Sequence, residues 1–277
     1  MKYAARMMIV VSSIAALQAC DNGDRATAPH TTAAEQNGAQ DTPEGTNVGG
    51  ATLLRVVKVA GDVDPKIAIF ADSVGLPDNG SAPGYHATGR RTVNWDGVQA
   101  PFLNNDNFPP DFFNTNATRG LVYRIAPGTG LRVSDNDFSD INPTYGTDLE
   151  PFSLPKMFAP IGTNIADIEF RIPGTNTPAA VARFGAVLDD PDLANTTRVI
   201  CYDKYGTVIA NVSSPVRRDP DEYSLVGVIF SAPVITRVRL ILGNTPMGAN
   251  INDISSGGTK DVGALDDLIY SEPQLIH

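Results

Sequence analysis

The sequence has very little histidine, tryptophan or cysteine, which restricts the chemistry that the chain can perform. Of 277 residues, three are His, one is Trp and two are Cys. His30 falls in a polar N-terminal stretch and His277 is the last residue, which leaves His86 for the folded domain. A zinc site of clustered histidines is thereby excluded, and a Ser-His-Asp triad would have to use His86. The sequence also lacks a nucleophile-elbow motif, a phosphate loop and a dinucleotide fingerprint.

Positive charge is also scarce. The chain has 21 Lys and Arg against 31 Asp and Glu, a net charge of −10 at pH 7. Nucleic-acid-binding proteins concentrate positive charge because their ligand is a polyanion. We therefore expect no nucleic-acid partner. Neutral glycans and divalent cations carry no electrostatic penalty on such a surface.

One long apolar run lies at the N-terminus. A basic segment precedes the run from Met7 to Ala19, which has the length of a secretory signal and is too short to span a bilayer. The run ends in Leu17-Gln18-Ala19-Cys20, which resembles the lipobox of bacterial lipoproteins, although Gln18 replaces the small residue usual there. The resemblance implies a lipoprotein signal over residues 1–20 and a lipid on Cys20. The alternative is cleavage that leaves Cys20 as an incidental thiol.

Residues 21–50 are rich in Ala, Thr, Gly, Asn and acidic residues and have almost no large apolar side chains. Such a segment cannot offset its chain entropy by burial, which predicts a disordered polar tether. Removal of residues 1–20 leaves 19 Lys and Arg against 31 acidic residues, a net charge of −12. Residues 51–277 are predicted to form a single domain. In it, Cys201 lies in an apolar run that is typical of a buried, unpaired thiol.

One helix is predicted near the start of this domain. Asp64-Pro65 is typical of a helix start, with Asp as the cap and Pro in the first helical position, and Gly75 supplies the stop. Apolar residues recur between them at helical spacing. Residues 98–119 contain three Pro and four Phe and few strand signals. This composition favours a loop whose aromatic side chains pin it to the core, rather than a ligand platform.

From Gly120 onward, short segments alternate between apolar and polar residues. The period-two segments begin at Leu121, Ala166, Ala182 and Val234. Such alternation indicates antiparallel sheets with one solvated face. Asp203–Gly206 is typical of a hairpin turn. Because no crossover helices separate the segments, we expect an all-β fold: a two-sheet antiparallel β-sandwich of jelly-roll type with one short N-terminal helix.

The domain carries an ordered series of short motifs between residues 63 and 273. They include Gly89–Arg91, Asn94–Gly97, Pro110–Asn114, Ile141–Tyr145, Phe184–Val187, Asp192–Thr197 and Leu265–Tyr270. This series resembles a group of uncharacterised secreted bacterial proteins, many of which carry a PEP-CTERM sorting tail. The resemblance implies a secreted β-sandwich and no particular activity. The chain ends at His277 without the tail, so the lipid anchor is expected to provide surface retention.

Two acidic clusters are candidates for a structural calcium, the one cofactor that the sequence suggests. Ca²⁺ takes about six to eight oxygen ligands. One cluster lies in a loop between strands, and the other lies in the last strand, where it is expected to meet an earlier acidic residue across the sandwich. The candidate metal ligands are Asp96, Asp189, Asp190, Asp192, Asp266 and Asp267.

The calcium hypothesis depends on whether the Asp267 side chain is buried. Asp267 is predicted to lie between Leu265 and Ile269 on one strand face, where an inward charge would be costly without a cation or hydrogen bonds. An early acidic residue and a late Asp-Asp pair are similar to carbohydrate-binding jelly rolls, which implies structural calcium. The alternatives are solvated acidic turns, or a bond to Asp267 from Arg90 or Arg91.

Arg90, Arg91 and Trp95 are the candidate ligand-binding residues. Guanidinium groups form bidentate pairs with carboxylates, and an indole ring stacks on a sugar ring. The favoured alternatives are an ion pair inside the sandwich for the arginines and a place in the core for Trp95.

These features together predict a lipid-anchored, non-enzymatic binding or adhesion module at the bacterial cell envelope, on the periplasmic or outer-membrane face. Glycans or envelope proteins are the expected partners, and no catalytic residue is assigned. A polysaccharide hydrolase with paired carboxylates is one alternative, because any Asp and Glu pair could meet in space. A purely structural protein of the envelope matrix is the other.

Overall fold

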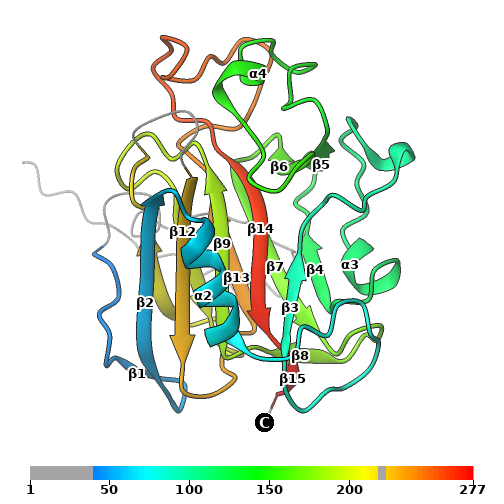
Figure 1. Ribbon diagram of the computed structural model, residues 1–277, viewed down its shortest axis with the longest axis vertical. Coiled ribbons are helices and arrows are strands. Elements are labelled where there is room, and N and C mark those ends of the chain that lie inside the picture. Colours follow the sequence, from blue (N-terminus) through cyan, green and yellow to red (C-terminus); the bar gives the residue numbers. More distant parts are fainter. Residues whose placement is uncertain (1–39, 218–222, 277) are drawn as a thin grey trace, which may run out of the picture. The chain divides into compact units, whose positions relative to one another are not determined.

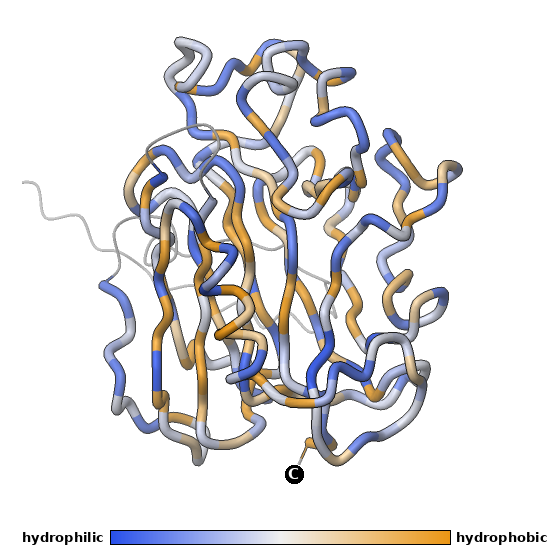
Figure 2. Tube along the Cα trace, viewed as in Figure 1, coloured by the Kyte–Doolittle hydropathy of each residue, from blue (hydrophilic) through white to orange (hydrophobic). Residues whose placement is uncertain are grey.

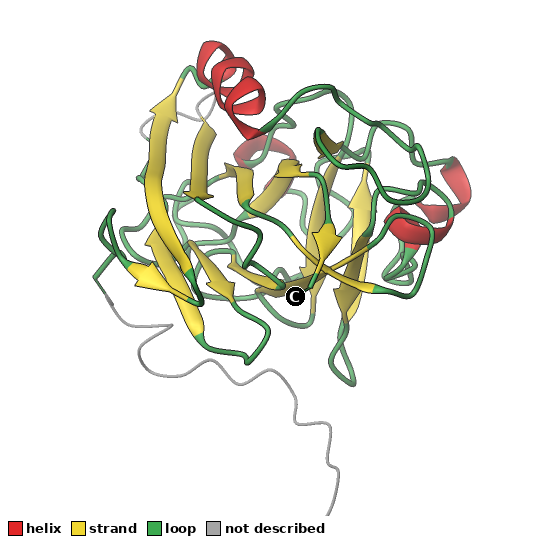
Figure 3. Cartoon of the chain, turned by 90° about the horizontal axis from the view of Figure 1, so that it is seen from below, coloured by secondary structure: helices red, strands yellow, loops and turns green. Residues whose placement is uncertain are grey.

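The computed structural model describes residues 40–217 and 223–276. These residues form two antiparallel β-sheets that pack face to face (Figure 1), and Figure 3 views them from the end that carries the C-terminus. The predicted all-β, two-sheet sandwich is therefore confirmed. None of the helices in the described ranges has the length and apolarity that a membrane crossing needs. Cys20 and the predicted signal lie outside the described residues.

Eight of the described strands form the first sheet. Its order is β1-β2-β12-β9-β14-β6-β5, and β3 pairs with the second half of β14. In chain order the strands are β1 (Asn47–Val48), β2 (Ala51–Gly61), β3 (Arg90–Val93), β5 (Gly130–Ser134), β6 (Met157–Ile161), β9 (Arg183–Asp189), β12 (Tyr223–Phe230) and β14 (Ala264–Ser271).

The other seven described strands form the second sheet. Its order is β11-β10-β13-β7-β8-β15, with β4 paired to β7. In chain order the strands are β4 (Leu121–Arg124), β7 (Ile165–Arg171), β8 (Pro178–Ala180), β10 (Arg198–Tyr202), β11 (Val208–Ser213), β13 (Arg237–Ile241) and β15 (Gln274–Leu275). The hairpin predicted at Asp203–Gly206 joins β10 to β11, and its N–H of Gly206 donates to the carbonyl of Asp203 at 3.0 Å.

The main core lies between the sheets and is built from alternate strand residues. Ile168 and Phe170 of β7 face Phe184 and Ala186 of β9, and all four side chains are fully buried. The buried Cys201 belongs to the same core, as predicted, and burial raises the pKa of its thiol. Figure 2 shows the apolar residues concentrated on the strands and on the helix that covers the first sheet.

That helix, α2, spans Asp64–Val74, as the sequence predicts. The residue before it, Val63, is the N-cap and makes no side-chain capping bond, so the capping role predicted for Asp64 is wrong. Asp64 instead lies in the first turn, where its charge complements the helix dipole. The other described helices are one short turn each: η1 (Ala100–Phe102), α3 (Phe112–Thr115) and α4 (Tyr145–Asp148).

The loop over residues 98–119 is pinned by its aromatic side chains, as predicted. Phe108, Phe112 and Phe113 are buried and contact one another. The segment also forms two isolated bridges with β5, Leu103 with Val133 and Asn107 with Leu131, so limited backbone pairing adds to the aromatic contacts.

Residues 40–50, which composition assigns to the tether, lie against the sandwich. The N–H of Thr42 donates to the carbonyl of Asn211 at 3.0 Å, and β1 pairs with β2. The folded unit therefore begins before residue 51, because backbone pairing is available to this polar segment without an apolar core of its own.

Helix α2 docks through Phe70 onto two glycines. Gly185 of β9 and Gly227 of β12 lie directly opposite each other in the antiparallel pair, and both lack the Cβ that would meet the Phe70 ring. A methyl group at either position would overlap that ring. The two glycines thus form a flat seat for the helix on the outer face of the first sheet.

Gly185→Ala is expected to lower the free energy of unfolding by about 1–3 kcal/mol, because it overpacks the Phe70 seat. Urea unfolding checks this. Gly97→Ala is the matched control, because a Cβ there meets nothing within 4 Å. Equal stabilities of the two variants would show that Phe70 does not require the glycine seat.

Candidate functional site

The predicted metal ligands gather at the end of the sandwich that carries α4, uppermost in Figure 1. Asp189 is the last residue of β9, and Asp190 and Asp192 follow it. Asp266 and Asp267 lie in β14, and Asp96 follows β3. The structure separates these residues into two groups, one around β14 and one around the loop after β9.

The β14 group is built on a β-bulge. The register of β14 against β9 shifts between Leu265 and Leu268, so Asp266 and Asp267 have no Cα partners on β9. The hydroxyl of Ser153 is 2.9 Å from Oδ1 of Asp266 and 3.0 Å from Oδ1 of Asp267. A regular strand would send the two carboxylates to opposite faces, so the bulge is what lets one hydroxyl contact both.

The strand face predicted for Asp267 is wrong for the same reason. Leu265 lies in the core between the sheets, whereas Ile269 packs under α2 on the outer face. The extra residue of the bulge reverses the alternation between them.

Asp96 lies on the same sheet as this pair, because β3 pairs with β14. The prediction that Asp96 meets the pair across the sandwich is therefore wrong. Its main-chain carbonyl accepts a hydrogen bond from Nζ of Lys156 at 2.5 Å. Burial, with a smaller contribution from the charge of Asp96, raises the pKa of Asp267 to about 6. Burial and the charge of Asp267 raise the pKa of Asp266 to about 8. The pair therefore retains one proton at neutral pH.

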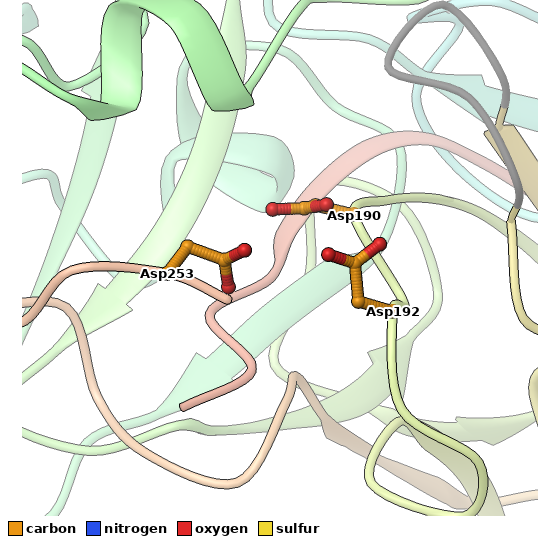
Figure 4. Close-up of side chains that lie close together, drawn as sticks. All are labelled: Asp190, Asp192 and Asp253. Carbon is orange, nitrogen blue, oxygen red and sulfur yellow. The ribbon is translucent and has the colours of Figure 1, made fainter. Parts of the chain in front are cut away.

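The second group consists of Asp190, Asp192 and Asp253 (Figure 4). One carboxylate oxygen from each lies within 4.8 Å of the other two. In the described part of the chain, no other three His, Cys, Asp or Glu side chains come this close together. Asp253 comes from the loop between β13 and β14, and the sequence analysis missed it because nothing local relates this loop to the one after β9.

Arg217 supplies positive charge to this group. Its guanidinium pairs with Oδ1 of Asp190, and its Nε lies 3.3 Å from Oδ1 of Asp192. One terminal nitrogen lies 3.9 Å from Oδ1 of Asp189. Burial nevertheless raises the pKa of Asp190 to about 10 and that of Asp189 to about 8, although the charge of Arg217 opposes both shifts.

The segment after α4 contacts the β14 pair and the end of β9. The N–H of Ser153 donates to Oδ2 of Asp266, and the N–H of Glu150 donates to Oδ2 of Asp189, each at 3.1 Å. This segment therefore bonds to the β14 pair and to the residue that precedes the second group.

The two arginines make internal contacts. Arg91 is fully buried and forms a bidentate pair with Glu272, with Nε–Oε2 at 2.7 Å and a terminal nitrogen 2.6 Å from Oε1. Its other terminal nitrogen donates to the carbonyls of Gly80 and Ala82 at 2.9 and 2.8 Å. Arg90 donates to the carbonyl of Gly75 at 3.0 Å. Both side chains hold the loop before β3 to the sheet. Arg91 makes the buried ion pair that the sequence left open, whereas Arg90 lies 3.5 and 3.6 Å from the solvent-accessible carboxylates of Asp72 and Asp78.

Trp95 is part of the core. Its ring is fully buried, stacks on Phe158 at 5.1 Å between centroids and meets Phe113 edge-on at 6.1 Å. Neither Arg91 nor Trp95 is therefore available to a ligand in this structure.

A cavity of about 380 Å³ lies at the other end of the sandwich, beside the hairpin between β10 and β11. Tyr205, at the tip of that hairpin, lines it and is 79% exposed. Asp203 and Lys204 of the same hairpin also line it. The other lining residues come from four further segments and are Gly49, Gly50, Ala180, Ala232, Pro233, Val234, Thr236, Gln274, Leu275 and Ile276. The sequence predicted the hairpin but not the cavity, which exists only because these distant segments meet.

A second cavity, of about 400 Å³, lies beside α4 and has an acidic lining. Asp135, Asp137 and Glu150 contribute carboxylates to it. Asp137 has a left-handed backbone, with φ of 55°. Burial, and then the charges of Glu150 and Asp135, raise the pKa of Asp137.

His86, the one histidine available for catalysis, has no triad partner in the described ranges. Its Nε2 is buried and makes no hydrogen bond to another described residue. The described residues therefore contain no Ser-His-Asp arrangement built on it.

Comparisons with known proteins give no family. No protein-family model matches the chain, and a search of curated proteins finds no match.

Among solved structures, the chain is similar to the CBM22-1 xylan-binding domain of Xyn10C from Paenibacillus barcinonensis, with 10% identity, 59% of this chain and 90% of that chain covered, and a TM-score of 0.29. The chain is also similar to a family 11 carbohydrate-binding module from Clostridium thermocellum, solved in complex with a mixed-linked β-1,3-1,4 tetrasaccharide. The identity is 9%, the match covers 71% of this chain and 100% of that chain, and the TM-score is 0.27. A third similar structure is the enzymatically active domain of tailspike protein 4 from bacteriophage CBA120. The identity is 11%, the match covers 64% of this chain and 22% of that chain, and the TM-score is 0.23.

The raised pKa of Asp266 predicts a pH dependence of stability. The carboxyl group ionises near 3.8 in the unfolded chain and near 8 in the folded one, so the folded state holds an extra proton between these values. Its stabilising contribution is present below about pH 4 and is lost as the pH rises toward 8. Asp266→Asn cannot titrate, so its stability is expected to fall less between pH 5 and pH 8.5 than that of the parent, by at least about 1 kcal/mol.

Chemical unfolding at both pH values checks this. Asp111→Asn, which removes an exposed carboxylate, is the control. Identical pH slopes in the parent and in Asp266→Asn would contradict the proton-sharing pair.

Proposed function

We propose that the chain is a non-enzymatic glycan-binding module that a lipid on Cys20 anchors at the bacterial cell envelope. The cavity beside Tyr205 is the observation that supports glycan binding. It combines apolar walls with an exposed aromatic ring and a few polar side chains, which is the usual composition of a small-ligand site.

A sugar ring fits this composition. A pyranose presents C–H groups on its faces and hydroxyl groups around its edge, so it needs an aromatic surface and polar groups beside it. The ring of Tyr205 provides the surface. Oδ1 of Asp203 accepts the N–H groups of Tyr205 and Thr207, both at 2.9 Å, which fixes this carboxylate at the cavity as a hydroxyl acceptor. Thr236 and Gln274 add further polar atoms to the lining.

The charge of the chain selects among glycans. After removal of residues 1–20 the net charge would be −12. A polyanionic polysaccharide would approach this surface against repulsion, so neutral glycans are favoured.

A polysaccharide hydrolase is the second candidate, and the acidic cavity beside α4 favours it. Glycoside hydrolysis uses two carboxyl groups, one of which stays protonated as the acid. Asp137, with its raised pKa, and Glu150 line the same cavity and would fill these roles.

Retention of the purified chain in gels that contain neutral polysaccharides tests the binding function. Tyr205→Ala is expected to weaken retention about tenfold, equivalent to about 1.4 kcal/mol, because the stacking surface is lost. Tyr85→Ala is the matched control, since Tyr85 is 56% exposed and does not line the cavity. Equal loss in both variants, or no retention of the parent on any neutral polymer, would contradict the assignment to this cavity. Shortening of the polymer that Asp137→Asn abolishes would instead establish the hydrolase.

The anchor has its own test. Cys20→Ser is expected to abolish incorporation of a labelled fatty acid and to release the chain from the membrane fraction, because two or more acyl chains provide the anchoring energy at roughly 0.8 kcal/mol per buried methylene. Cys201→Ser is the control, since that thiol is buried in the core. Incorporation that survives in Cys20→Ser would rule out the lipobox.

A further inference from the structure

The three carboxylates of Asp190, Asp192 and Asp253, the triad, converge inside the protein instead of pointing into solvent as in an ordinary acidic turn. Figure 4 shows the three carboxylates turned toward one another from two different loops. Like charges at such distances repel, and Asp190 and Asp253 are both fully buried, where water cannot screen the repulsion. Something must offset this cost in the folded state.

Hydrogen bonds fix two of the carboxylates. Asp253 accepts the N–H of Val262 at 2.8 Å and the N–H of Ser255 at 2.7 Å. Oδ2 of Asp192 accepts the hydroxyl of Ser255 at 2.5 Å. These contacts hold the carboxylates in position without cancelling their charge.

Asp190 supplies the second observation. Its side chain is fully buried, Oδ1 pairs with Arg217, and Oδ2 has no hydrogen-bond partner among the described residues. A buried carboxylate oxygen without a donor costs several kcal/mol unless it is protonated or bound to a cation.

Arg217 brings one positive charge to a larger number of carboxyl groups among the described residues. Five carboxyl groups adjoin one another here, and Arg217 forms ion pairs with those of Asp189, Asp190 and Asp192. The five are those of Asp189, Asp190, Asp192, Asp253 and Asp261.

The ligand atoms indicate which cation fits. The triad offers carboxylate oxygens only, with no imidazole or thiolate, which favours a hard cation over zinc or copper. Carboxylates that bind through one or both oxygens, from two irregular loops, suit the variable coordination of Ca²⁺ better than the strict octahedron of Mg²⁺.

We propose that Asp190, Asp192 and Asp253 bind one Ca²⁺, which joins the loop after β9 to the loop between β13 and β14. Asp190 and Asp192 are two of the metal ligands that the sequence predicted, Asp253 is new, and the β14 pair is not part of this site. It lies at the opposite end of the sandwich from the Tyr205 cavity, so it is independent of the glycan-binding proposal.

Calcium titration of the full chain, after treatment with a chelator, tests the site. Isothermal titration is expected to show one Ca²⁺ per chain, and saturating Ca²⁺ is expected to raise the Tm by about 5–10 °C. Mg²⁺ at the same concentration is expected to give a smaller shift. No binding at millimolar Ca²⁺, or an equal response to Mg²⁺, would overturn the proposal.

Variants locate the ion. Asp253→Asn and Asp192→Asn are each expected to lower the calcium affinity at least tenfold. The side chain of Asp192 is 18% exposed, so Asp192→Asn remains informative if the buried Asp253 is needed for folding. Asp266→Asn removes a carboxylate of the β14 group, Glu150→Gln removes one from the acidic cavity, and both are expected to bind Ca²⁺ like the parent. A loss of affinity in either control, with the triad variants unaffected, would place the ion elsewhere and overturn the assignment.

Discussion

A carboxylate that leaves water must be hydrogen-bonded, protonated or bound to a cation, and this requirement organises the α4 end of the sandwich. Asp261 meets it with hydrogen bonds from the N–H groups of Asp192 and Leu193 and from the hydroxyl of Thr196. Asp266 meets it with Ser153 and a shared proton. The loops at this end have little regular structure. Their N–H and hydroxyl groups instead donate hydrogen bonds to the buried carboxylates, and these bonds hold the loops in their conformation.

The same requirement separates structural charges from candidate ligands. Arg91 and Glu272 are as deeply buried as Asp190 and Asp253. However, each atom that pairs Arg91 with Glu272 has a partner at 2.6–2.7 Å, and the remaining guanidinium nitrogen donates to backbone carbonyls. A pair saturated in this way has no capacity left for a ligand. Asp190, equally buried, keeps an oxygen without a donor among the described residues. The Arg91–Glu272 pair and Asp190 are equally buried, and they differ in whether every polar atom has a hydrogen-bond partner.

The two ends of the sandwich provide different chemistry. The end that carries α4 has a cavity lined by carboxylates, whereas the opposite end carries a cavity with an aromatic ring exposed on a hairpin. The core between them is continuous and apolar. A cation at one end would then stabilise loops without contacting a sugar at the other, so stabilisation and recognition can be carried by separate residues of one fold. Two functions placed this far apart could change independently, since substitutions at one end leave the contacts of the other intact.

The sequence by itself determined the class of fold and several local elements. Alternation along β7, β9 and β13 predicted which side chains enter the core, and Asp64-Pro65 and Gly75 predicted the extent of α2, because these features depend on residues within a few positions of one another. Tertiary structure decided the rest. Arg91 meets a partner 181 residues away, Asp253 joins Asp190 from another loop, and one bulge in β14 reverses the faces that alternation assigns to its aspartates. Such contacts depend on strand register and on how distant segments pack, and a local pattern contains neither.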